Sequence, residues 1–486
     1  MTDFAVPTTM VRIAEDCAGL GTGFCIFRRS AHNLSKAAAN PLRRKKQREL
    51  GKKIQIDPVY MSESHRPLRH FLKHKWPLTK IVEDSNLGSD VRGDALLGTD
   101  GTIDVYIAGN SCQPFSKQGK NSGCKDVRSN TTRDSVDFIK TRRPKCFIIE
   151  QVKNITSKTH KKWFQQRILR TLKHLKRKDG RKLYKVRKEI YDSERFGTPQ
   201  IRKRLYIIGV RTDVPCLRRF KMPVDGGLRR RSLASLLASA RSGQQVEDWE
   251  LTYTELRNWT AIKGQLEDRT DVKYPVIGDF QQSHAFGVSF QERKCMTITK
   301  SRAQQRAFWI ISKSKDGFSK RRLTVRDYAL LMGWDKKSQT QYLGINEFHC
   351  PRNANQQLPL KDVEHGSKLS QSQLLAGLGN AFSVPVFQAI AENILKCFNG
   401  QKVNSDSDSD SDSDSEGPWE EHCSDHYNSS VDQFHTPVKK RKFPHASGKS
   451  SSLEAAIDEH SALEKGHKGF QTPTSPHLAR QISHCQ

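Results

Sequence analysis

The segment that decides the fold is IDVYIAGNSCQPFSKQG, residues 103–119. Its first five residues are β-branched or aromatic, apart from Asp104, as in a buried strand. The rest is rich in the Gly, Asn, Ser and Pro of tight loops. Cys112 is therefore expected just past the carboxyl end of a strand, where open α/β sheets bind ligands. An arbitrary free cysteine is usually a small buried hydrophobe, but one held in such a loop is a candidate nucleophile.

The composition favours a polyanionic partner. The 486 residues contain 83 Lys and Arg against 52 Asp and Glu, a net charge of +31, and residues 1–400 alone carry +36. Such a surplus is typical of nucleic-acid-binding proteins, while the alternative is a generically basic soluble surface. The eleven cysteines include no pair at zinc-ligand spacing, so we expect no metal and no disulfides. No apolar run approaches the roughly 20 residues of a membrane span, so we expect no membrane partner.

Two strand ends near the N-terminus carry acids. Residues 11–14 predict a strand, followed by a turn that contains Glu15, Gly19 and Gly21 and then by a helix. A strand, a glycine-rich turn and a helix let the backbone approach a ligand closely. A second predicted strand ends at Glu63, where an acid can reach ribose hydroxyls. Each pattern is weak alone, because glycine turns and acids after strands are common.

Glu150 and a basic extended segment complete the candidate site. The short apolar run before Glu150 predicts a strand buried on both faces, which delivers this acid to the same sheet edge as Cys112. Further along, Gln200, Arg202 and Arg204 alternate in an extended segment. Alternate residues point the same way, so we expect all three to face the active-site cleft. The alternative is a basic surface with no phosphate partner.

Taken together, these motifs resemble those of the cytosine-5 DNA methyltransferase family, which uses S-adenosylmethionine. Six separated motifs follow the family's order over about residues 11–395. They are the glycine turn after residue 14, the Cys-Gln-Pro-Phe-Ser loop at 112–116, Glu-Gln-Val at 150–152, Gln-x-Arg-x-Arg at 200–204, Arg-x-Leu-Thr-x-Arg at 321–326 and Gly-Asn at 379–380. The resemblance implies an α/β fold: a Rossmann-like methyltransferase domain, a smaller target-recognition region and a disordered C-terminal tail.

The resemblance also implies roles for individual residues. The catalytic residues would be Cys112, Glu150, Arg202 and Arg204. The residues that bind S-adenosylmethionine would be Glu15, Gly19, Gly21, Glu63, Asp94 and Asn380, and those that bind nucleic acid would be Gln200 and Arg202. The expected substrate is double-stranded DNA, with RNA as an alternative.

The implied chemistry explains why these groups are needed. Carbon 5 of cytosine is a poor nucleophile, so the Cys112 thiolate must first add to carbon 6. A free thiol has a pKa of about 8.5, so neighbouring positive charge from Arg202 and Arg204 would favour the thiolate. Glu150, with a pKa raised by burial, would hold a proton at ring nitrogen 3 while Arg204 binds the carbonyl oxygen. The base must be flipped out of the duplex to reach them.

Four regions are predicted along the chain. Residues 1–212 would form the catalytic and cofactor-binding domain, 213–320 the target-recognition region and 321–400 the helices that close the first domain. Within the second region, residues 296–299 are the most strand-like. Residues 401–486 begin with Ser-Asp repeats and should be a disordered tail. A basic run at 437–442 resembles a nuclear import signal, so we expect a nuclear protein with a monomeric catalytic unit.

Two departures from the family pattern keep alternatives open. Ser111 stands where the family has proline, which predicts a looser nucleophile loop. Cys17 stands where the family has an aromatic residue beside the adenine ring. The alternatives are a transfer-RNA methyltransferase of the same fold and a noncatalytic nucleic-acid-binding relative.

Overall fold

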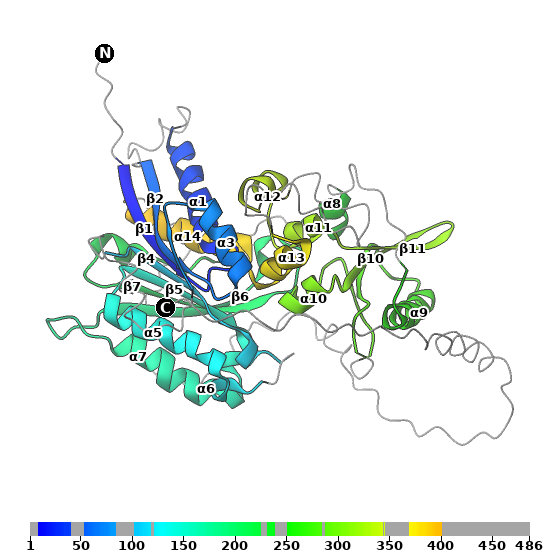
Figure 1. Cartoon of the computed structure of the whole chain (residues 1–486), viewed down its shortest axis with the longest axis horizontal. Coiled ribbons are helices and arrows are strands. Elements are labelled where there is room, and N and C mark those ends of the chain that lie inside the picture. Colours follow the sequence, from blue (N-terminus) through cyan, green and yellow to red (C-terminus); the bar gives the residue numbers. More distant parts are fainter. Residues whose placement is uncertain are drawn as a thin grey trace, which may run out of the picture. The chain divides into compact units, whose positions relative to one another are not determined.

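The computed structural model describes residues 8–39, 53–83, 102–117, 121–224, 231–238, 250–283, 287–343, 345 and 369–400. A seven-stranded sheet, here called the large sheet, carries the candidate site (Figure 1). In spatial order its strands are β3 Lys80–Val82, β2 Lys53–Ser62, β1 Thr8–Asp16, β4 Val105–Gly109, β5 Cys146–Val152, β7 Lys203–Arg211 and β6 Tyr184–Asp192. The expected tail at 401–486 lies outside the described residues.

Strand direction divides the large sheet into two functional edges. The first five strands in spatial order are parallel, while β7 runs antiparallel to both β5 and β6. The carboxyl ends of β1, β2, β4 and β5 and the start of β7 therefore share one edge, which we call the carboxyl edge. The opposite edge, where β7 ends, is the amino edge. This arrangement confirms the expected Rossmann-like class.

Helices cover both faces of the large sheet. One face packs against α1 Thr22–Ala39, α3 Arg66–Lys75 and α14 Val384–Phe398, and the other against α5 Asn130–Arg142, α6 Lys158–Trp163, a π-helical segment Phe164–Leu169 and α7 Arg170–His174. Strand β4 shows why both faces can be apolar. Its residues Val105 and Ile107 enter one core and Tyr106 and Ala108 the other, and all four are fully buried.

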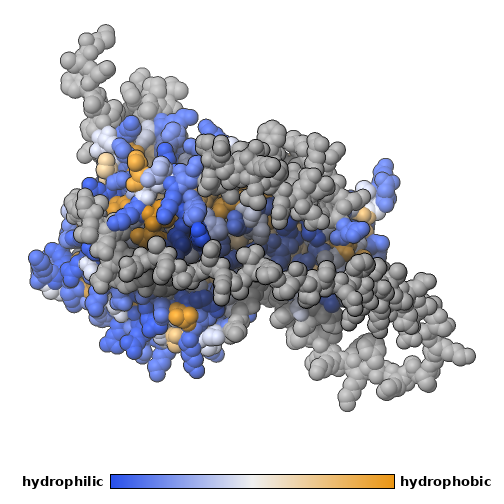
Figure 2. Space-filling model, in the orientation of Figure 1, coloured by the Kyte–Doolittle hydropathy of each residue, from blue (hydrophilic) through white to orange (hydrophobic). Residues whose placement is uncertain are grey.

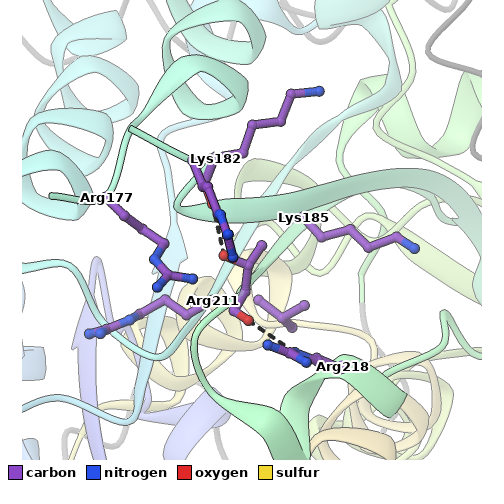
Figure 3. A pocket seen from close by; sticks show the side chains of 8 residues that line it. Arg177, Lys182, Lys185, Arg211 and Arg218 are labelled. Carbon is purple, nitrogen blue, oxygen red and sulfur yellow. Dashed lines mark hydrogen bonds between the residues drawn. The ribbon is translucent and has the colours of Figure 1, made fainter. Parts of the chain in front are cut away.

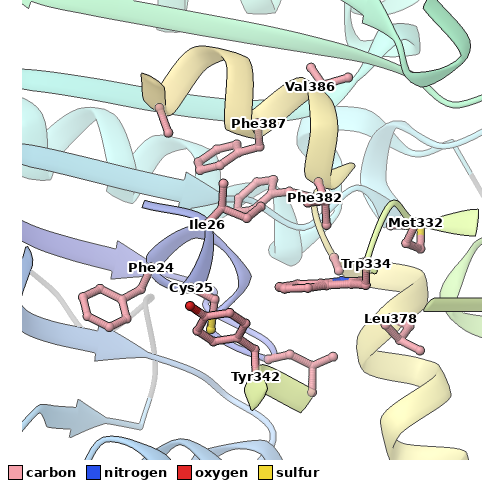
Figure 4. Close-up of a cluster of buried hydrophobic side chains, with 14 of the residues drawn as sticks. Phe24, Cys25, Ile26, Met332, Trp334, Tyr342, Leu378, Phe382, Val386 and Phe387 are labelled. Carbon is pink, nitrogen blue, oxygen red and sulfur yellow. The ribbon is translucent and has the colours of Figure 1, made fainter. Parts of the chain in front are cut away.

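The last helix of the described residues packs against the first helix of the chain. Phe27 of α1 lies edge-on to Phe387 of α14, with 6.1 Å between ring centroids, and Phe387 stacks on Phe382 at 4.3 Å. Figure 4 shows Phe387 and Phe382 within the buried cluster that also contains Trp334. In chain order, three helices precede α14: α11 Val325–Leu331, α12 Lys336–Leu343 and α13 Gln371–Asn380. Helix α11 begins with a capping box, in which the side chains of Thr324 and Asp327 each accept from the other residue's backbone amide.

A second, four-stranded antiparallel sheet was not foreseen. In spatial order it comprises β11 Gly317–Arg322, β10 Phe308–Ser314, β8 Val276–Asp279 and β9 Ser289–Glu292. Its own core contains Trp309 of β10, which stacks on Phe280 at 5.0 Å. The remaining helices in this part are α8 Leu233–Ala238, α9 Tyr253–Glu267 and α10 Lys300–Gln304.

Residues 296–299, the most strand-like piece of the second region by sequence, do not form a strand. This segment follows the single bridge between Cys295 and Gln200, and none of its residues joins a sheet. Its strand-like composition instead serves side-chain packing, since Ile298 is fully buried.

No single helix in the described ranges is long and apolar enough to cross a membrane, although the bent pair α13 and α14 passes the same test of length and composition. Hydrophilic residues cover most of the coloured surface in the view of Figure 2.

Candidate active site

Cys112 lies three residues past the end of β4, at the carboxyl edge of the large sheet. Its thiol is partly exposed and forms no disulfide. The carbonyl of Cys112 accepts a hydrogen bond from the Phe115 amide at 3.1 Å, which closes the 3-10 turn Gln113–Phe115. The Phe115 ring is fully buried, stacked on Trp163 with centroids 5.4 Å apart. A buried aromatic anchor thus holds the turn that presents the sulfur.

The backbone of Ser111 is fixed on both sides, contrary to the looser loop expected from its sequence. Its amide donates to Thr131 Oγ1 at 3.2 Å, and its carbonyl accepts from Gln151 Nε2 at 3.0 Å. Gln151 is itself oriented, because its Oε1 accepts from the Val152 amide at 2.9 Å. Two neighbouring side chains therefore supply the restraint that proline would have supplied.

A second network ties the far end of the loop to the start of α6. Asn154 Nδ2 donates to the Phe115 carbonyl at 2.8 Å and to Asn121 Oδ1 at 3.1 Å. His160 Nε2 contacts the same Asn121 oxygen at 2.8 Å, so this nitrogen carries the proton. Burial lowers the pKa of His160, which keeps the ring neutral near pH 7. Nothing in the local sequence distinguishes these residues, because the contacts are tertiary.

Glu150 and Arg204 form a buried ion pair beside the cysteine loop. Glu150 pairs in register with Gly109 of β4, and its Oε1 lies 3.0 Å from Arg204 Nε. Both side chains are about one-tenth exposed. Burial raises the pKa of Glu150, and the charges of Arg204 and Arg202 only partly oppose this shift. Glu150 therefore holds a proton to higher pH than an ordinary glutamate, as expected from its sequence context.

The three alternating side chains do not share one cleft. Gln200 is fully buried and its Nε2 lies 3.4 Å from the Leu331 carbonyl. Arg202 is 3% exposed and donates to three backbone carbonyls, those of Ile298 at 2.7 Å, Gly379 at 3.3 Å and Ala381 at 2.7 Å. Only Arg204 reaches Glu150, so the expectation of a common cleft-facing surface needs correction. The extended alternation is interrupted because β7 begins only at Lys203.

Arg202 can still act on the cysteine through its charge. Burial lowers the pKa of Arg202 to about 10, and a charge on Cys112 acts in the opposite direction, so the two groups interact. Arg202 remains positively charged near neutral pH, so its charge acts at the cysteine loop. Its assignment to catalysis and nucleic-acid binding, like that of Gln200 to nucleic-acid binding, stays a prediction.

Arg128 is a further cation at the loop that sequence reasoning missed. It donates to the Gln113 side chain and forms an ion pair with Asp126 at 2.6 Å. The hydrogen bond to Asp126 raises the pKa of Arg128, and a charge on Cys112 raises it as well. Arg128 lies in a polar segment with many basic residues, and no spacing or motif marks it.

The predicted cofactor residues gather at the ends of β1 and β2. Glu15 is 1% exposed and accepts from the amides of Gly23 and Phe24, each at 2.9 Å, so it caps α1. Burial raises the pKa of Glu15 to about 7. Glu63 accepts from the Gly19 amide at 2.7 Å, which links the two strand ends. The predicted Asp94 lies outside the described residues.

The glycine turn leaves room for a ligand. Gly19 and Gly21 have φ of +57° and +68°, which favours glycine at both positions. A side chain placed at Gly19 would meet no atom of the described residues within 4 Å. Asn380 is exposed at the end of α13, two residues before Phe382, which lies 3.1 Å from a Cβ placed on Gly109. Backbone amides and carboxylates here fit a nucleoside with hydroxyl and amino groups.

A buried carboxylate missed by sequence reasoning braces these strand ends. Asp16 accepts hydrogen bonds from Ser62 Oγ at 2.7 Å and from the hydroxyls of Tyr60 at 3.2 Å and Tyr106 at 2.6 Å. These donors come from β2 and β4, on either side of β1. Asp16 therefore fixes the relative positions of the three strand ends at which the glycine turn, Glu63 and the cysteine loop begin.

Known proteins are similar to this chain in sequence. The family described as C-5 cytosine-specific DNA methylase matches residues 48–396. Type II methyltransferase M.NgoBI of Neisseria gonorrhoeae is 33% identical over 33% of this chain and 47% of its own length. Type II methyltransferase M1.ScrFI of Lactococcus lactis subsp. cremoris is 26% identical over 65% of this chain and 69% of its own.

A solved methyltransferase from Entamoeba histolytica, EhMeth, has a TM-score of 0.49 and 14% identity, covering 80% of this chain and 98% of that chain. The chain thus spans about half the length of the Neisseria relative and more than two thirds of the Lactococcus relative. Since the family match extends over most of the sequence and includes the Cys112 loop, the protein belongs to the C-5 cytosine-specific DNA methylase family.

Proposed function

We propose that the protein methylates carbon 5 of cytosine in double-stranded DNA through a covalent bond between Cys112 and the base. The supporting observation is that the Cys112 loop and the Glu150–Arg204 pair lie at neighbouring strand ends of the carboxyl edge. Strands β4, β5 and β7 are neighbours, and Gly109 pairs with Glu150 while Val152 pairs with Arg204. A nucleophile, a carboxyl with raised pKa and a guanidinium therefore belong to three neighbouring strand ends.

The proposed chemistry assigns each group one task. Cys112 Sγ bonds to carbon 6, and the electron pair of the 5,6 double bond becomes available at carbon 5. Glu150 holds a proton at ring nitrogen 3, and Arg204 binds the carbonyl oxygen that gains charge. When bound, S-adenosylmethionine supplies the methyl group. Loss of the carbon-5 proton to a base then restores the double bond and releases Cys112.

The residues that would hold S-adenosylmethionine are Gly19, Gly21, Glu63 and Asn380, with Glu15 acting through the helix that it caps. Glu63 has both oxygens engaged by backbone amides, of Gly19 and of His65 at 2.8 Å, which orients its remaining lone pairs. Ribose hydroxyls are suitable donors to them. The cofactor assignment thus depends on groups that are already positioned.

Methyl transfer from radiolabelled S-adenosylmethionine tests this proposal. The full-length protein is incubated with duplex DNA and, separately, with transfer RNA, and the product is sequenced after bisulfite treatment. We expect label in DNA and protected cytosines at discrete positions. Label in transfer RNA alone would assign the RNA as substrate, and transfer to neither would indicate a noncatalytic relative.

Two further properties are part of the proposal. The basic run at 437–442, which lies outside the described residues, supports a nuclear location, to be tested by imaging a fluorescent fusion with and without this run. A monomeric catalytic unit is expected because Cys112, Glu150 and Arg204 all come from one chain. Light scattering after size-exclusion chromatography measures this directly.

A further inference from the structure

A basic pocket lies at the amino edge of the large sheet, opposite Cys112. It encloses about 470 Å³, within the roughly 300–1,000 Å³ typical of ligand sites. Unlike the usual apolar ligand site, it is lined mainly by cations: Arg177, Arg181, Lys182, Lys185, Arg211 and Arg218. Figure 3 shows five of these side chains around the pocket.

Hydrogen bonds fix the backbone that builds this basic pocket. The loop before β6 folds back on itself, since the Leu183 amide donates to the Leu175 carbonyl at 2.7 Å. Thr212 Oγ1 then donates to the Lys182 carbonyl at 2.8 Å, and Arg218 Nε donates to the Thr212 carbonyl at 3.1 Å. The loop before β6, the residue after β7 and the turn Pro215–Arg219 are thereby joined. These hydrogen bonds fix the backbone segments that carry the cations.

Two arginines of the pocket form ion pairs with neighbouring carboxylates. Arg177 pairs with Asp179 at 2.7 Å, and Arg211 pairs with Asp213 at 2.6 Å. Six of the eight residues that line the pocket are nonetheless cations. A concave surface lined by one sign of charge focuses its field and attracts counter-ions. An anion with several charges is the ligand class that this arrangement favours.

A basic segment of the chain connects the catalytic loop with this pocket. Between residues 158 and 188 the chain has fourteen Lys and Arg and a single acid, Asp179. Helix α6 begins this stretch and ends at Trp163, whose ring stacks on Phe115 of the cysteine loop. In β6, burial lowers the pKa of Lys188 to about 8, and repulsion from Lys173 of α7 lowers it too. Such crowding of like charges favours bound phosphates over an empty surface.

We propose that the basic pocket binds backbone phosphates of nucleic acid on one side of the target base. Arg204 and Arg211 lie seven residues apart on β7, which corresponds to roughly 23 Å at about 3.3 Å per residue. This length spans about seven base pairs at 3.4 Å each. Arginine forks suit phosphate oxygens, and four of the six cations are arginines. Nucleic acid as the source rests on the proposed function, whereas phosphate as the ligand does not.

The test measures binding rather than methylation, so a protein that fails to methylate would still give an answer. Arg181 and Lys182 are exposed, and the variant R181Q/K182Q should fold normally. The matched control, K36Q/K53Q, removes two exposed lysines from α1 and the start of β2. Fluorescence anisotropy is recorded for the full chain with duplexes of about 8 and 30 base pairs that share a central sequence, across a salt series.

For the 30-base-pair duplex we expect R181Q/K182Q to bind at least about tenfold more weakly at 0.1 M salt, with the slope of log affinity against log salt reduced by about two. Binding of the 8-base-pair duplex should change less than about twofold, because it is too short to reach the pocket. K36Q/K53Q should bind both duplexes like wild type. Unchanged affinity and slope with the long duplex would remove nucleic acid as the source.

Calorimetry with inorganic tripolyphosphate tests whether the pocket binds a free polyphosphate rather than the phosphates of nucleic acid. Tripolyphosphate binding to wild type that R181Q/K182Q loses would support a phosphate site. If duplex binding is then unaffected, the site belongs to a free polyphosphate. Loss of neither tripolyphosphate nor duplex binding in R181Q/K182Q would overturn the proposal altogether.

Discussion

The two edges of the large sheet use charge in opposite ways. At the carboxyl edge charged groups are buried and each has defined partners: Glu150 pairs with Arg204, and Arg202 binds three carbonyls. At the amino edge six cations line the basic pocket, and two of them, Arg181 and Lys182, are exposed. Removing one partner of a buried pair costs about 3–5 kcal/mol, whereas an exposed pair contributes about 0–1 kcal/mol. The buried charges of the carboxyl edge therefore fix the positions of side chains, whereas the exposed charges of the amino edge attract anions.

This difference predicts how substitutions at each edge respond to salt. Debye screening weakens exposed interactions far more than buried ones. Changes at the carboxyl edge should therefore alter rate or stability almost equally at low and high salt. Changes at the amino edge should alter binding, and their effect should fade as salt rises.

The largest effect is expected for Cys112→Ser, which should abolish methyl transfer and leave the fold intact. A hydroxyl of similar size is a much weaker nucleophile than a thiolate. Wild type should form a covalent adduct on DNA that contains 5-fluorocytosine, and Cys112→Ser should not, as measured by denaturing electrophoresis. Cys124→Ser is the matched control, because Cys124 is an exposed cysteine twelve residues away. An adduct that is lost in Cys124→Ser instead would show that the assignment of Cys112 as the nucleophile is wrong.

Glu150→Gln should lower the single-turnover methylation rate by about 10²–10³-fold, the usual cost of losing one stabilising group at a developing charge. The pH dependence gives a sharper test. Because burial raises the pKa of Glu150, the protonated form persists above the ordinary glutamate range and is lost as pH rises through that raised value. The wild-type rate should therefore fall on the alkaline side with this group, and Glu150→Gln should lack that decline. An identical decline in both proteins would assign it to another group.

Arg202→Met compares the edges by stability. It removes three hydrogen bonds from a buried cation, so we expect a loss of about 3 kcal/mol in the free energy of unfolding, measured with urea. Arg181→Met, an exposed arginine of the basic pocket, should change the same quantity by less than about 0.5 kcal/mol. Equal losses would contradict the distinction between a positioning cation and an attracting one.

The large sheet was predictable because its strands are buried on both faces. The apolar runs around Val105 and Ile148 can be recognised as strands from the local sequence alone. The parallel order of these strands then places Cys112 and Glu150 at one edge of the sheet. The four-stranded antiparallel sheet was missed because β10 changes from apolar residues at Phe308 to polar ones at Ser314, without regular alternation. The contacts of Arg202 were also out of reach, since their partners lie 96 to 179 residues away.

Ser111→Pro is expected to have the smallest effect, and its direction sharpens the account of the carboxyl edge. From sequence alone, restoring the family's proline should tighten the loop and raise the rate. In the structure the Ser111 amide donates to Thr131 Oγ1, and proline has no such donor. The lost hydrogen bond costs about 0.5–1.5 kcal/mol, while the stiffer unfolded chain returns about 0.4–1 kcal/mol, so stability should hardly change.

The rate should instead fall, by about two- to fivefold, because part of the restraint on the residue before Cys112 is lost; a fivefold change corresponds to about 1 kcal/mol in the barrier. Thr131→Val is the matched variant, since it removes the same acceptor without changing the backbone of the loop. Single-turnover methylation should slow in both variants. A faster Ser111→Pro enzyme beside a slower Thr131→Val enzyme would mean that the fixed φ of proline outweighs the hydrogen bond, and that preorganisation of this loop is limited by torsional freedom at residue 111.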